Sequence, residues 1–305
     1  MIYVIGHKNP DTDSICSAIG YAALKQQLGM ECEPRRAGEI NPETKFILNR
    51  FGVEEPQFLP SAKDEKIILV DHNEIAQAVD ELSEGTVIEI MDHHKIGDVQ
   101  TKEPIYFRNM PLGCTATIVY LSYKENNIQP EKAVAGLLCS AILSDTLAFR
   151  SPTCTATDKA AALALAEIAG IGDCEAYAKE MFAAGSNLAE KSEKEIFYLD
   201  FKKFTAGTTT FGVGQVTSMS AEELSVLKGR MIAYLENTFA EHGADMLFFM
   251  LTDIMEESTE LLYAGNGAED AVKKAFVSAE ENRTYLKGVV SRKKQIVPQL
   301  TEALS

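Results

Sequence analysis

Histidine and aspartate side chains in this sequence gather where short apolar segments end. Four of the five histidines follow such segments, and aspartates accompany them. The set consists of His7, His72, His93, His94, Asp11, Asp13, Asp71, Asp92 and Asp145. A single histidine beside an apolar segment is usually structural, and a single aspartate there usually caps a helix or forms a turn. Because the pattern recurs at four separate places, the sequence predicts a functional cluster.

Imidazole and carboxylate groups without thiolates suit a borderline divalent ion such as Mn²⁺ or Co²⁺. Zinc stays an alternative, although it usually binds fewer carboxylates. One ion does not need so many ligands, whereas two ions about 3.5–4 Å apart and bridged by a carboxylate would use them. Such a pair lowers the pKa of a bridging water and holds the oxygen of a phosphoryl group. The residues therefore predict metal-assisted hydrolysis of a phosphate ester or anhydride.

A second feature is a cluster of basic residues near the end of the chain. The segment Ser291-Arg292-Lys293-Lys294-Gln295 precedes Pro298, near the start of a predicted final helix. Cations near a helix N-terminus suit a compact, highly charged phosphate. Lys202 and Lys203 form a weaker basic signal, which taken alone indicates an ordinary surface.

The predicted elements explain how residues far apart in sequence could meet. Near-continuous β-branched segments separated by helical patterns are typical of buried parallel strands. These segments are 2–5, 67–70 and 87–91, while 141–143 is either a strand or the end of a helix that begins near Pro130. An apolar stripe at helical spacing follows the first strand. Since the carboxyl ends of parallel strands share one edge of a sheet, the polar residues there should converge.

The chain is long enough for two domains. After the polar stretch 185–192, the sequence predicts strands at 209–217, 246–251 and 261–264 and helices at 221–242 and 267–279. We therefore expect an α/β protein with a metal-binding catalytic domain at 1–187, a linker at 188–192 and a smaller substrate-binding α/β domain at 193–305. The site would lie between the two domains.

Composition excludes several classes of protein. The 29 basic and 45 acidic residues give a net charge of −16, which disfavours nucleic acid as a partner. No apolar segment approaches the roughly 18–20 residues of a membrane span, and the first residues do not resemble a secretory signal. The six cysteines form no CxxC pair, so reduced thiols and a cytoplasmic location are expected. Phosphate-binding GxxxxGK[ST] loops, GxSxG elbows and HExxH motifs are absent from the sequence.

Four sequence motifs carry a resemblance to a known family. They are Gly6-His7-Lys8-Asn9-Pro10-Asp11-Thr12-Asp13-Ser14, Val70-Asp71-His72-Asn73, Asp92-His93-His94 and Ser144-Asp145-Thr146. Together they resemble the DHH phosphoesterase superfamily. With Ser291-Arg292-Lys293-Lys294-Gln295 in a DHHA2 C-terminal domain, the chain looks like a family II, manganese-dependent inorganic pyrophosphatase. The resemblance covers essentially the whole chain.

The resemblance implies a role for each residue of the cluster. The first ion would be held by His7, Asp11 and Asp71, and the second by Asp13, Asp71, His93 and Asp145. His94 would donate a proton to the leaving phosphate, supported by Asp92, while pyrophosphate would be bound by Lys202, Arg292 and Lys293. The choice of Lys202 over Lys203 rests on a short Asp200-x-Lys202 match.

The expected activity is that of an inorganic diphosphatase, a phosphoric anhydride hydrolase. A hydroxide bridging two metal ions would cleave pyrophosphate into two orthophosphates. Two Mn²⁺ or Co²⁺ ions per subunit are expected, with additional Mg²⁺ entering with the substrate. Family members commonly form homodimers through the first domain, and no membrane partner is expected.

Two alternatives stay open. A phosphodiesterase of short oligonucleotides or cyclic dinucleotides would keep the metal chemistry, but it would need a base-stacking surface. A non-catalytic metal-responsive module would need neither His94 beside His93 nor cations supplied by another domain.

Overall fold

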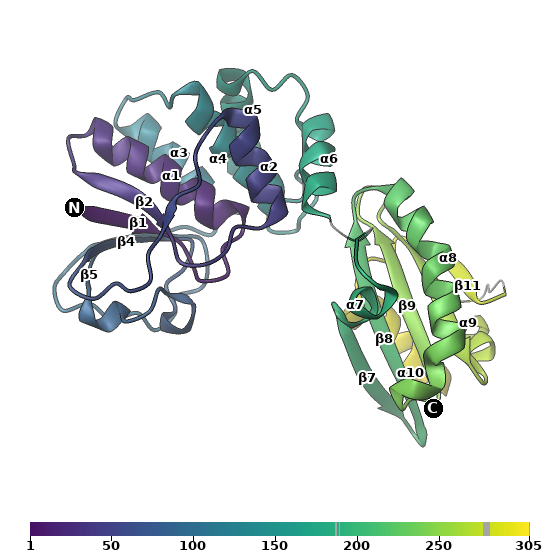
Figure 1. The fold of residues 1–305 in the computed structure, drawn as a ribbon. Helices are drawn as coiled ribbons and strands as arrows, with labels where there is room; N and C mark the ends of the chain where they lie inside the picture. Colours follow the sequence, from purple (N-terminus) through teal and green to yellow (C-terminus); the bar gives the residue numbers. More distant parts are fainter. Residues whose placement is uncertain (187, 189, 277–280, 305) are drawn as a thin grey trace. The chain divides into compact units, whose positions relative to one another are not determined.

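The computed structural model describes residues 1–186, 188, 190–276 and 281–304. The chain divides into two compact units, Met1–Gly185 and Ser186–Ser305 (Figure 1). Each unit has its own sheet and its own hydrophobic core.

The first unit is built on a six-stranded sheet in which all the strands are parallel. Its strands lie in the order β3-β2-β1-β4-β5-β6. Their bounds are β1 Ile2–Ile5, β2 Cys32–Arg36, β3 Gln57–Phe58, β4 Lys66–Val70, β5 Thr86–Asp92 and β6 Tyr106–Asn109. The predicted α/β class is confirmed.

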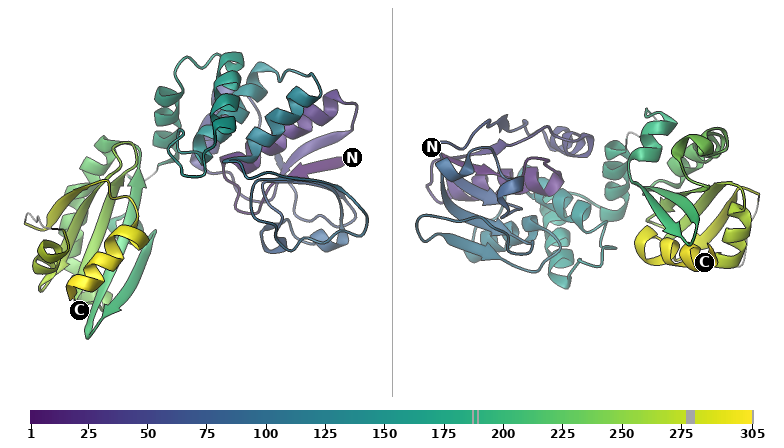
Figure 2. Two further views of the ribbon diagram at one scale, coloured as in Figure 1. Left: turned by 180° about the vertical axis from the view of Figure 1, so that it is seen from behind. Right: turned by 90° about the horizontal axis from the view of Figure 1, so that it is seen from below.

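Helices cover one face of this sheet (Figures 1 and 2). They are α1 Thr12–Gln27, α2 Pro42–Phe51, α3 Thr115–Glu125, α4 Lys132–Asp145, α5 Ala156–Ala169 and α6 Cys174–Gly185. On the other face, Ile5, Ile67, Leu69 and Ile90 pack under loops and two short 3₁₀ helices, Ile75–Gln77 and Leu82–Glu84. The largest core of the unit thus lies between the sheet and α1, α3 and α4.

In this unit the sequence left one apolar segment undecided and did not reveal three of the strands. The apolar segment 141–143 is the end of helix α4, which resolves the alternative in favour of a helix. Strands β2, β3 and β6 were not predicted, because they lie at or near the sheet edges and are partly exposed. β2 also contains Pro34 and two arginines, so its sequence lacks the apolar signature of a strand.

The second unit contains a five-stranded mixed sheet in the order β11-β10-β9-β8-β7. Only β8 and β9 run parallel. The strands are β7 Phe201–Ala206, β8 Thr209–Ser218, β9 Met246–Asp253, β10 Ser258–Gly265 and β11 Arg283–Lys287. The helical elements are α7 Glu193–Tyr198, α8 Ala221–Thr238, the 3₁₀ helix Phe239–His242, α9 Ala268–Phe276, the π-helix Arg292–Ile296 and α10 Val297–Leu304.

Helices cover both faces of the second sheet. One core joins the sheet to α9, the π-helix and α10, and the other joins it to α7 and α8. Strands at 209–217, 246–251 and 261–264 and the long helix from Ala221 agree with the sequence analysis. Of the helix predicted at 267–279, residues 277–279 lie outside the described residues, as does Ala189 of the predicted linker 188–192. Among the described residues, no helix is both long and apolar enough to span a bilayer.

Candidate metal centre

The polar cluster lies at the ends of the neighbouring strands β1 and β4, where the chain connections turn to opposite sides of the sheet. From β1 the chain continues through α1 to β2 on one side, whereas β4 leads to β5 on the other. His7 follows β1 by two residues, and Asp71 follows β4 directly. A parallel sheet binds ligands at such a switch point because its loops leave a crevice there.

The turn between β1 and α1 is built around a glycine. A Cβ on Gly6 would lie 1.8 Å from Oγ of Ser14, so no side chain fits there. That hydroxyl oxygen accepts a hydrogen bond from the His7 backbone N–H at 2.9 Å. Asp11 caps α1 by accepting from the Ser14 N–H through Oδ1 at 2.9 Å. Its other oxygen, Oδ2, lies 3.4 Å from Nε2 of His7.

Asp71 lies at the centre of the cluster. Its Oδ2 is 3.3 Å from Nε2 of His7, and its Oδ1 is 3.4 Å from Nε2 of His93. The side chain is buried, and its backbone adopts the left-handed conformation with φ of 64°. Thr115 donates from Oγ1 to Asp71 Oδ1 at 3.2 Å. Oδ2 is buried and accepts no hydrogen bond of normal geometry within the described part of the chain.

His93 is fixed through one ring nitrogen and free at the other. Its Nδ1 lies 3.0 Å from the carbonyl oxygen of Leu112, which assigns the proton to Nδ1. Nε2 lies between Asp71 and Oδ2 of Asp145, the latter 3.8 Å away. Burial alone would lower the pKa of His93, but Asp71 and Asp13 raise it to about 9, so Nε2 is protonated at neutral pH. Asp145 is the last residue of α4. When a cation replaces the Nε2 proton, the Nδ1–H bond to Leu112 leaves the tautomer that a metal-ligating histidine needs.

Asp13 is held by the start of another helix. The backbone N–H groups of Thr115 and Ala116, in the first turn of α3, donate to its two oxygens at 2.6 and 2.9 Å. The Ser17 hydroxyl donates to Oδ1 at 2.7 Å. The positive end of the α3 dipole also favours a negative charge at this position.

Asp92 connects the paired histidines. Its Oδ1 accepts from the backbone N–H groups of His93 and His94, at 2.7 and 3.1 Å, and lies 2.9 Å from Nδ1 of His94. Its Oδ2 accepts from the Asn73 amide. The side chain of His94 is 53 % exposed, whereas Asp92 is fully buried. His94 thus presents an oriented, accessible imidazole beside the cluster.

Three groups of these residues bring ligand atoms within 4.8 Å of one another. They are His7, Asp11 and Asp71; Asp13, Asp71, His93 and Asp145; and Asp71, His93 and His94. The first two contain the same residues as the two metal sites implied by the resemblance. His72 belongs to none of the groups, although it lies at a strand end. It is buried with Nδ1 on the Val70 carbonyl oxygen at 2.9 Å, and its buried Nε2 has no hydrogen-bond partner among the described residues.

The pKa values show how strongly these charges interact. Burial alone would lower the pKa of His7, but the adjacent carboxylates of Asp11 and Asp71 outweigh it and raise the pKa to about 10. Burial would likewise raise the pKa of Asp71, yet the adjacent imidazoles of His7 and His93 lower it. Burial, with the charge of Asp71, raises the pKa of Asp13 to about 7. The same two effects, with the charge of Asp13 added, place the pKa of Asp145 well above its usual value.

These observations fit divalent cations. Four carboxylates in close proximity repel one another, and a bound cation offsets that repulsion. The buried Oδ2 of Asp71 lacks a normal hydrogen bond, and the two oxygens of Asp71 face different ligand groups. Imidazole with several carboxylates and no thiolate is a donor set that suits Mn²⁺ or Co²⁺.

The predicted substrate ligands all lie in the second unit. Arg292 opens the π-helix, and its guanidinium donates to Asp200 Oδ1 at 2.7 Å and approaches the Val213 carbonyl oxygen at 3.5 Å. Lys202 is paired with Val213 in the β7–β8 ladder, which places it near Arg292. Lys293 follows Arg292 in the π-helix.

Sequence reasoning missed several residues that position the cluster. Thr115, Ser17 and Asn73 each bond to one of its aspartates. Glu43 accepts from the hydroxyls of Thr12 and Ser144, both at 2.6 Å, and so ties together the neighbours of Asp13 and Asp145. Ser and Thr are common everywhere in proteins, so nothing in their types marks these residues in the sequence.

The fold and the cluster define a class: a two-unit α/β protein with a His/Asp metal centre at the switch point of a parallel sheet. Residues 1–142 match the DHH family, N-terminal domain, and residues 179–303 match the DHHA2 domain. The chain is 48 % identical to a probable manganese-dependent inorganic pyrophosphatase of Clostridium acetobutylicum, over 100 % of this chain and 98 % of that protein. It is 46 % identical to the manganese-dependent inorganic pyrophosphatase of Bacillus subtilis, over 100 % and 99 %.

A solved structure supports the same family assignment. The crystal structure of a putative family II inorganic pyrophosphatase from Methanococcus jannaschii is 44 % identical and has a TM-score of 0.65, covering 100 % of this chain and 99 % of that one. The chain belongs to the manganese-dependent, family II inorganic pyrophosphatases. The resemblance seen in the sequence motifs is thereby confirmed.

Proposed function

We propose that this protein hydrolyses inorganic pyrophosphate to two orthophosphates with the help of divalent metal ions. The observation that carries the proposal is the position of Asp71, whose two oxygens face two different sets of His and Asp ligands. One carboxylate between two ligand sets is the arrangement that a two-metal hydrolase requires. The names of the relatives support the same substrate.

The two ligand sets would hold one Mn²⁺ or Co²⁺ ion each. His7, Asp11 and Asp71 would hold the first, and Asp13, Asp71, His93 and Asp145 the second. When bound, such ions lower the pKa of water, which supplies hydroxide at neutral pH, and they offset charge on a phosphate oxygen. A further Mg²⁺ entering with pyrophosphate is part of the proposal.

His94 would give a proton to the leaving phosphate. Its Nδ1 is held by Asp92 at 2.9 Å, which leaves Nε2 of a half-exposed ring available. The hydrogen bond to Asp92 raises the pKa of His94, so a larger fraction of its imidazole is protonated at neutral pH. Asp92 would act through His94 by fixing the orientation of its ring.

The second unit would bind the substrate through Lys202, Arg292 and Lys293. Strand alternation supports Lys202 over Lys203. Phe204 and Ala206, on the same face of β7 as Lys202, pack in the core that also contains Ile296 of the π-helix. Lys203 faces the other way, and its Nζ would lie 3.3 Å from a Cβ on Gly243. Lys202 and Arg292 therefore share one face of the second sheet.

We also propose that the protein is cytoplasmic and forms a homodimer through its first unit. Six unpaired cysteines support a reducing compartment. The edge strand β6 exposes half of Tyr106 and 42 % of Phe107, which supports contact with a second copy. Sedimentation of the full chain at several concentrations tests the dimer, and a monomer throughout would contradict it.

The function is tested by phosphate release from three substrates in the presence of Mn²⁺: pyrophosphate, a dinucleotide and a long polyphosphate. We expect pyrophosphate to be strongly preferred. Asp71→Ala should abolish activity together with metal binding, because it removes a ligand from both sets. Preferential cleavage of the dinucleotide would favour a phosphodiesterase, and metal binding without release from any substrate would favour a non-catalytic module.

A further inference from the structure

The carboxylate of Glu43, in the first turn of α2, joins two segments that are far apart in the chain. Its Oε1 accepts one hydrogen bond from the Thr12 hydroxyl and another from the Ser144 hydroxyl, both at 2.6 Å. These donors lie 31 residues before and 101 residues after Glu43. Burial raises the pKa of Glu43 against the effect of both hydroxyls. A single oxygen atom thus connects the start of α1 to the end of α4.

Both donors are neighbours of metal-site residues in the sequence. Thr12 lies between Asp11, which belongs to the first ligand set, and Asp13, which belongs to the second. Ser144 directly precedes Asp145, another member of the second set. The carboxylate that holds the two donors belongs to neither set. It therefore connects segments that contribute to both proposed ion sites without being a ligand itself.

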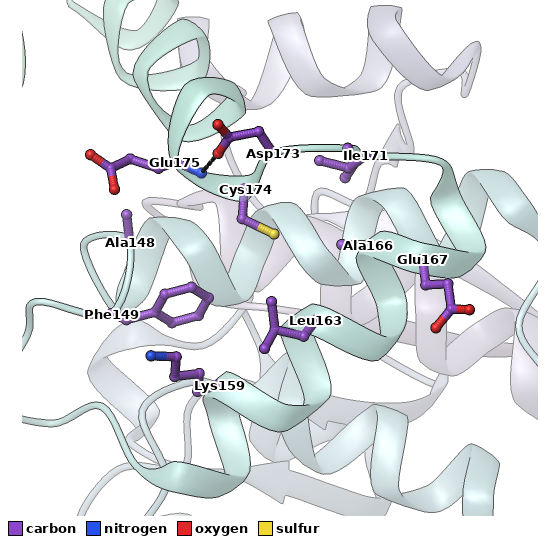
Figure 3. Close-up of a pocket in the computed structure, with 11 residues that line it drawn as sticks. Ala148, Phe149, Lys159, Leu163, Ala166, Glu167, Ile171, Asp173, Cys174 and Glu175 are labelled. Carbon is purple, nitrogen blue, oxygen red and sulfur yellow. Dashed lines mark hydrogen bonds between the residues drawn. The ribbon is translucent and has the colours of Figure 1, made fainter.

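Helix α6 also packs against Glu43. A Cβ on Gly185, the last residue of α6, would lie 2.8 Å from Cβ of Glu43, so the two segments approach as closely as a glycine allows. The first turn of α6 lines the pocket in Figure 3 together with the turn after α4. There, Glu175 pairs with Arg150 at 3.3 Å. The helix thus contacts Glu43 at one end and the turn that follows α4 at the other.

We propose that Glu43 is a positioning residue of the metal centre, which sets the separation between the start of α1 and the end of α4 and thereby the Mn²⁺ affinity of both ligand sets. This inference rests on the proposed two-metal function. The ligand carboxylates repel one another, so the segments that carry them tend to move apart. Two hydroxyls bonded to one shared oxygen oppose that movement, and they do so before any cation binds.

A matched comparison in the second unit separates this role from a purely structural one. A carboxylate in the first turn of a helix is also favoured by the helix dipole alone. Glu223 lies in the first turn of α8 and accepts from the hydroxyls of Ser218, at 2.6 Å, and Ser186. Glu43 and Glu223 are both half-buried, but the described residues of the second unit contain no ligand group. Glu223→Ala therefore removes equivalent hydrogen bonds away from the metal centre.

The experiment measures Mn²⁺ binding to the metal-free, full-length protein by isothermal titration calorimetry. Loss of a group that orients a metal ligand typically weakens metal binding by about 10- to 100-fold. Because Glu43 acts through neighbours of the ligands, Glu43→Ala should raise the Kd of both ions by about 10-fold, the lower end of that range. Glu43→Gln keeps an acceptor oxygen and should restore most of the affinity. Glu223→Ala should bind Mn²⁺ as the wild type does.

Ser144→Ala tests one half of the arrangement. It removes the hydrogen bond next to Asp145 and leaves the one from Thr12, so the affinity should fall for one of the two ions only. This variant replaces a hydroxyl by a hydrogen and should fold normally. It therefore tests the proposal even if Glu43→Ala does not fold.

Three results would overturn the role of Glu43 while leaving the proposed function intact. One is a wild type that binds two Mn²⁺ ions with the same affinities as Glu43→Ala and Ser144→Ala. Another is equal weakening in Glu43→Gln and Glu43→Ala, because the charge of Glu43 would then matter and its hydrogen bonds would not. The third is equal weakening in Glu223→Ala. A wild type that binds fewer than two ions would instead contradict the proposed function together with this inference.

Discussion

Removal of the metals should destabilise one unit of the chain and leave the other unchanged. All three ligand groups found in the described residues lie in Met1–Gly185, and none lies in Ser186–Ser305. A ligand that binds only the folded state raises the free energy of unfolding. Because the two units have separate cores, chelation should lower the unfolding temperature of the first unit alone.

The magnitude follows from linkage and from the size of the unit. One ion at a free concentration 1,000 times its Kd adds about 4.1 kcal/mol to the free energy of unfolding. In a unit of this length each kcal/mol moves the midpoint by about 2–4 °C. Chelation should thus lower the first midpoint by about 8–16 °C for one ion and by more for two.

Differential scanning calorimetry of the full chain, with Mn²⁺ or with excess chelator, measures this shift. Met231→Ala identifies the transition of the second unit, because this buried side chain belongs only to the α7–α8 core. Its loss should cost about 2–5 kcal/mol there. Asp145→Asn keeps the side-chain shape but weakens one ligand, so its Mn²⁺-dependent shift should be smaller. The reasoning would be refuted if the unfolding midpoint of the first unit did not change with the chelator, or if the midpoint of the second unit fell.

Three further predictions test individual residues. His94→Gln should keep its bound Mn²⁺, as measured by elemental analysis. It should lower kcat by about 10²- to 10⁴-fold, the range for loss of one general acid. Loss of the metal with an intact fold would instead show that His94 is a metal ligand. Arg292→Ala should raise KM and lower kcat for pyrophosphate, whereas Lys203→Ala, on the other face of β7, should change neither. Equal changes in KM and kcat for the two variants would contradict the faces assigned to these residues. Gly6→Ala should lower the free energy of unfolding by about 1–3 kcal/mol and weaken Mn²⁺ binding, because its Cβ would lie 1.8 Å from Oγ of Ser14. An unchanged unfolding midpoint in calorimetry would show that the turn can relax.

Sequence reasoning brought the polar residues into one cluster because parallel strands impose a simple geometry. His7, Asp71 and His93 all follow buried strands, and such strand ends must meet at one edge. The same reasoning could not decide whether 141–143 is a strand, since a short apolar segment fits either element. In the structure Asp145 comes from the end of helix α4, so it reaches the cluster by a different route from His7, Asp71 and His93.

The groups that hold the side chains of the cluster in place could not be predicted from the sequence, for a physical reason. Asp13 is held by backbone N–H groups of Thr115 and Ala116, which lie 102 and 103 residues further along the chain. Every residue except proline has such an N–H group, so its availability depends on where a helix begins in space. The Thr115 hydroxyl bonds to Asp71, so this helix start also fixes the central carboxylate. Only the packing of α3 against α1 brings these groups together.

The same packing explains how the cluster keeps its shape through bonds made by the chain alone. In Asp11 and His93, one polar atom is used for structure and another faces the centre of the cluster. Asp11 caps α1 with Oδ1 and faces His7 with Oδ2. His93 bonds Leu112 through Nδ1 and faces Asp71 through Nε2. Because these structural bonds set the orientations, a cation would find its ligands already placed, and less of its binding energy would be spent on ordering them.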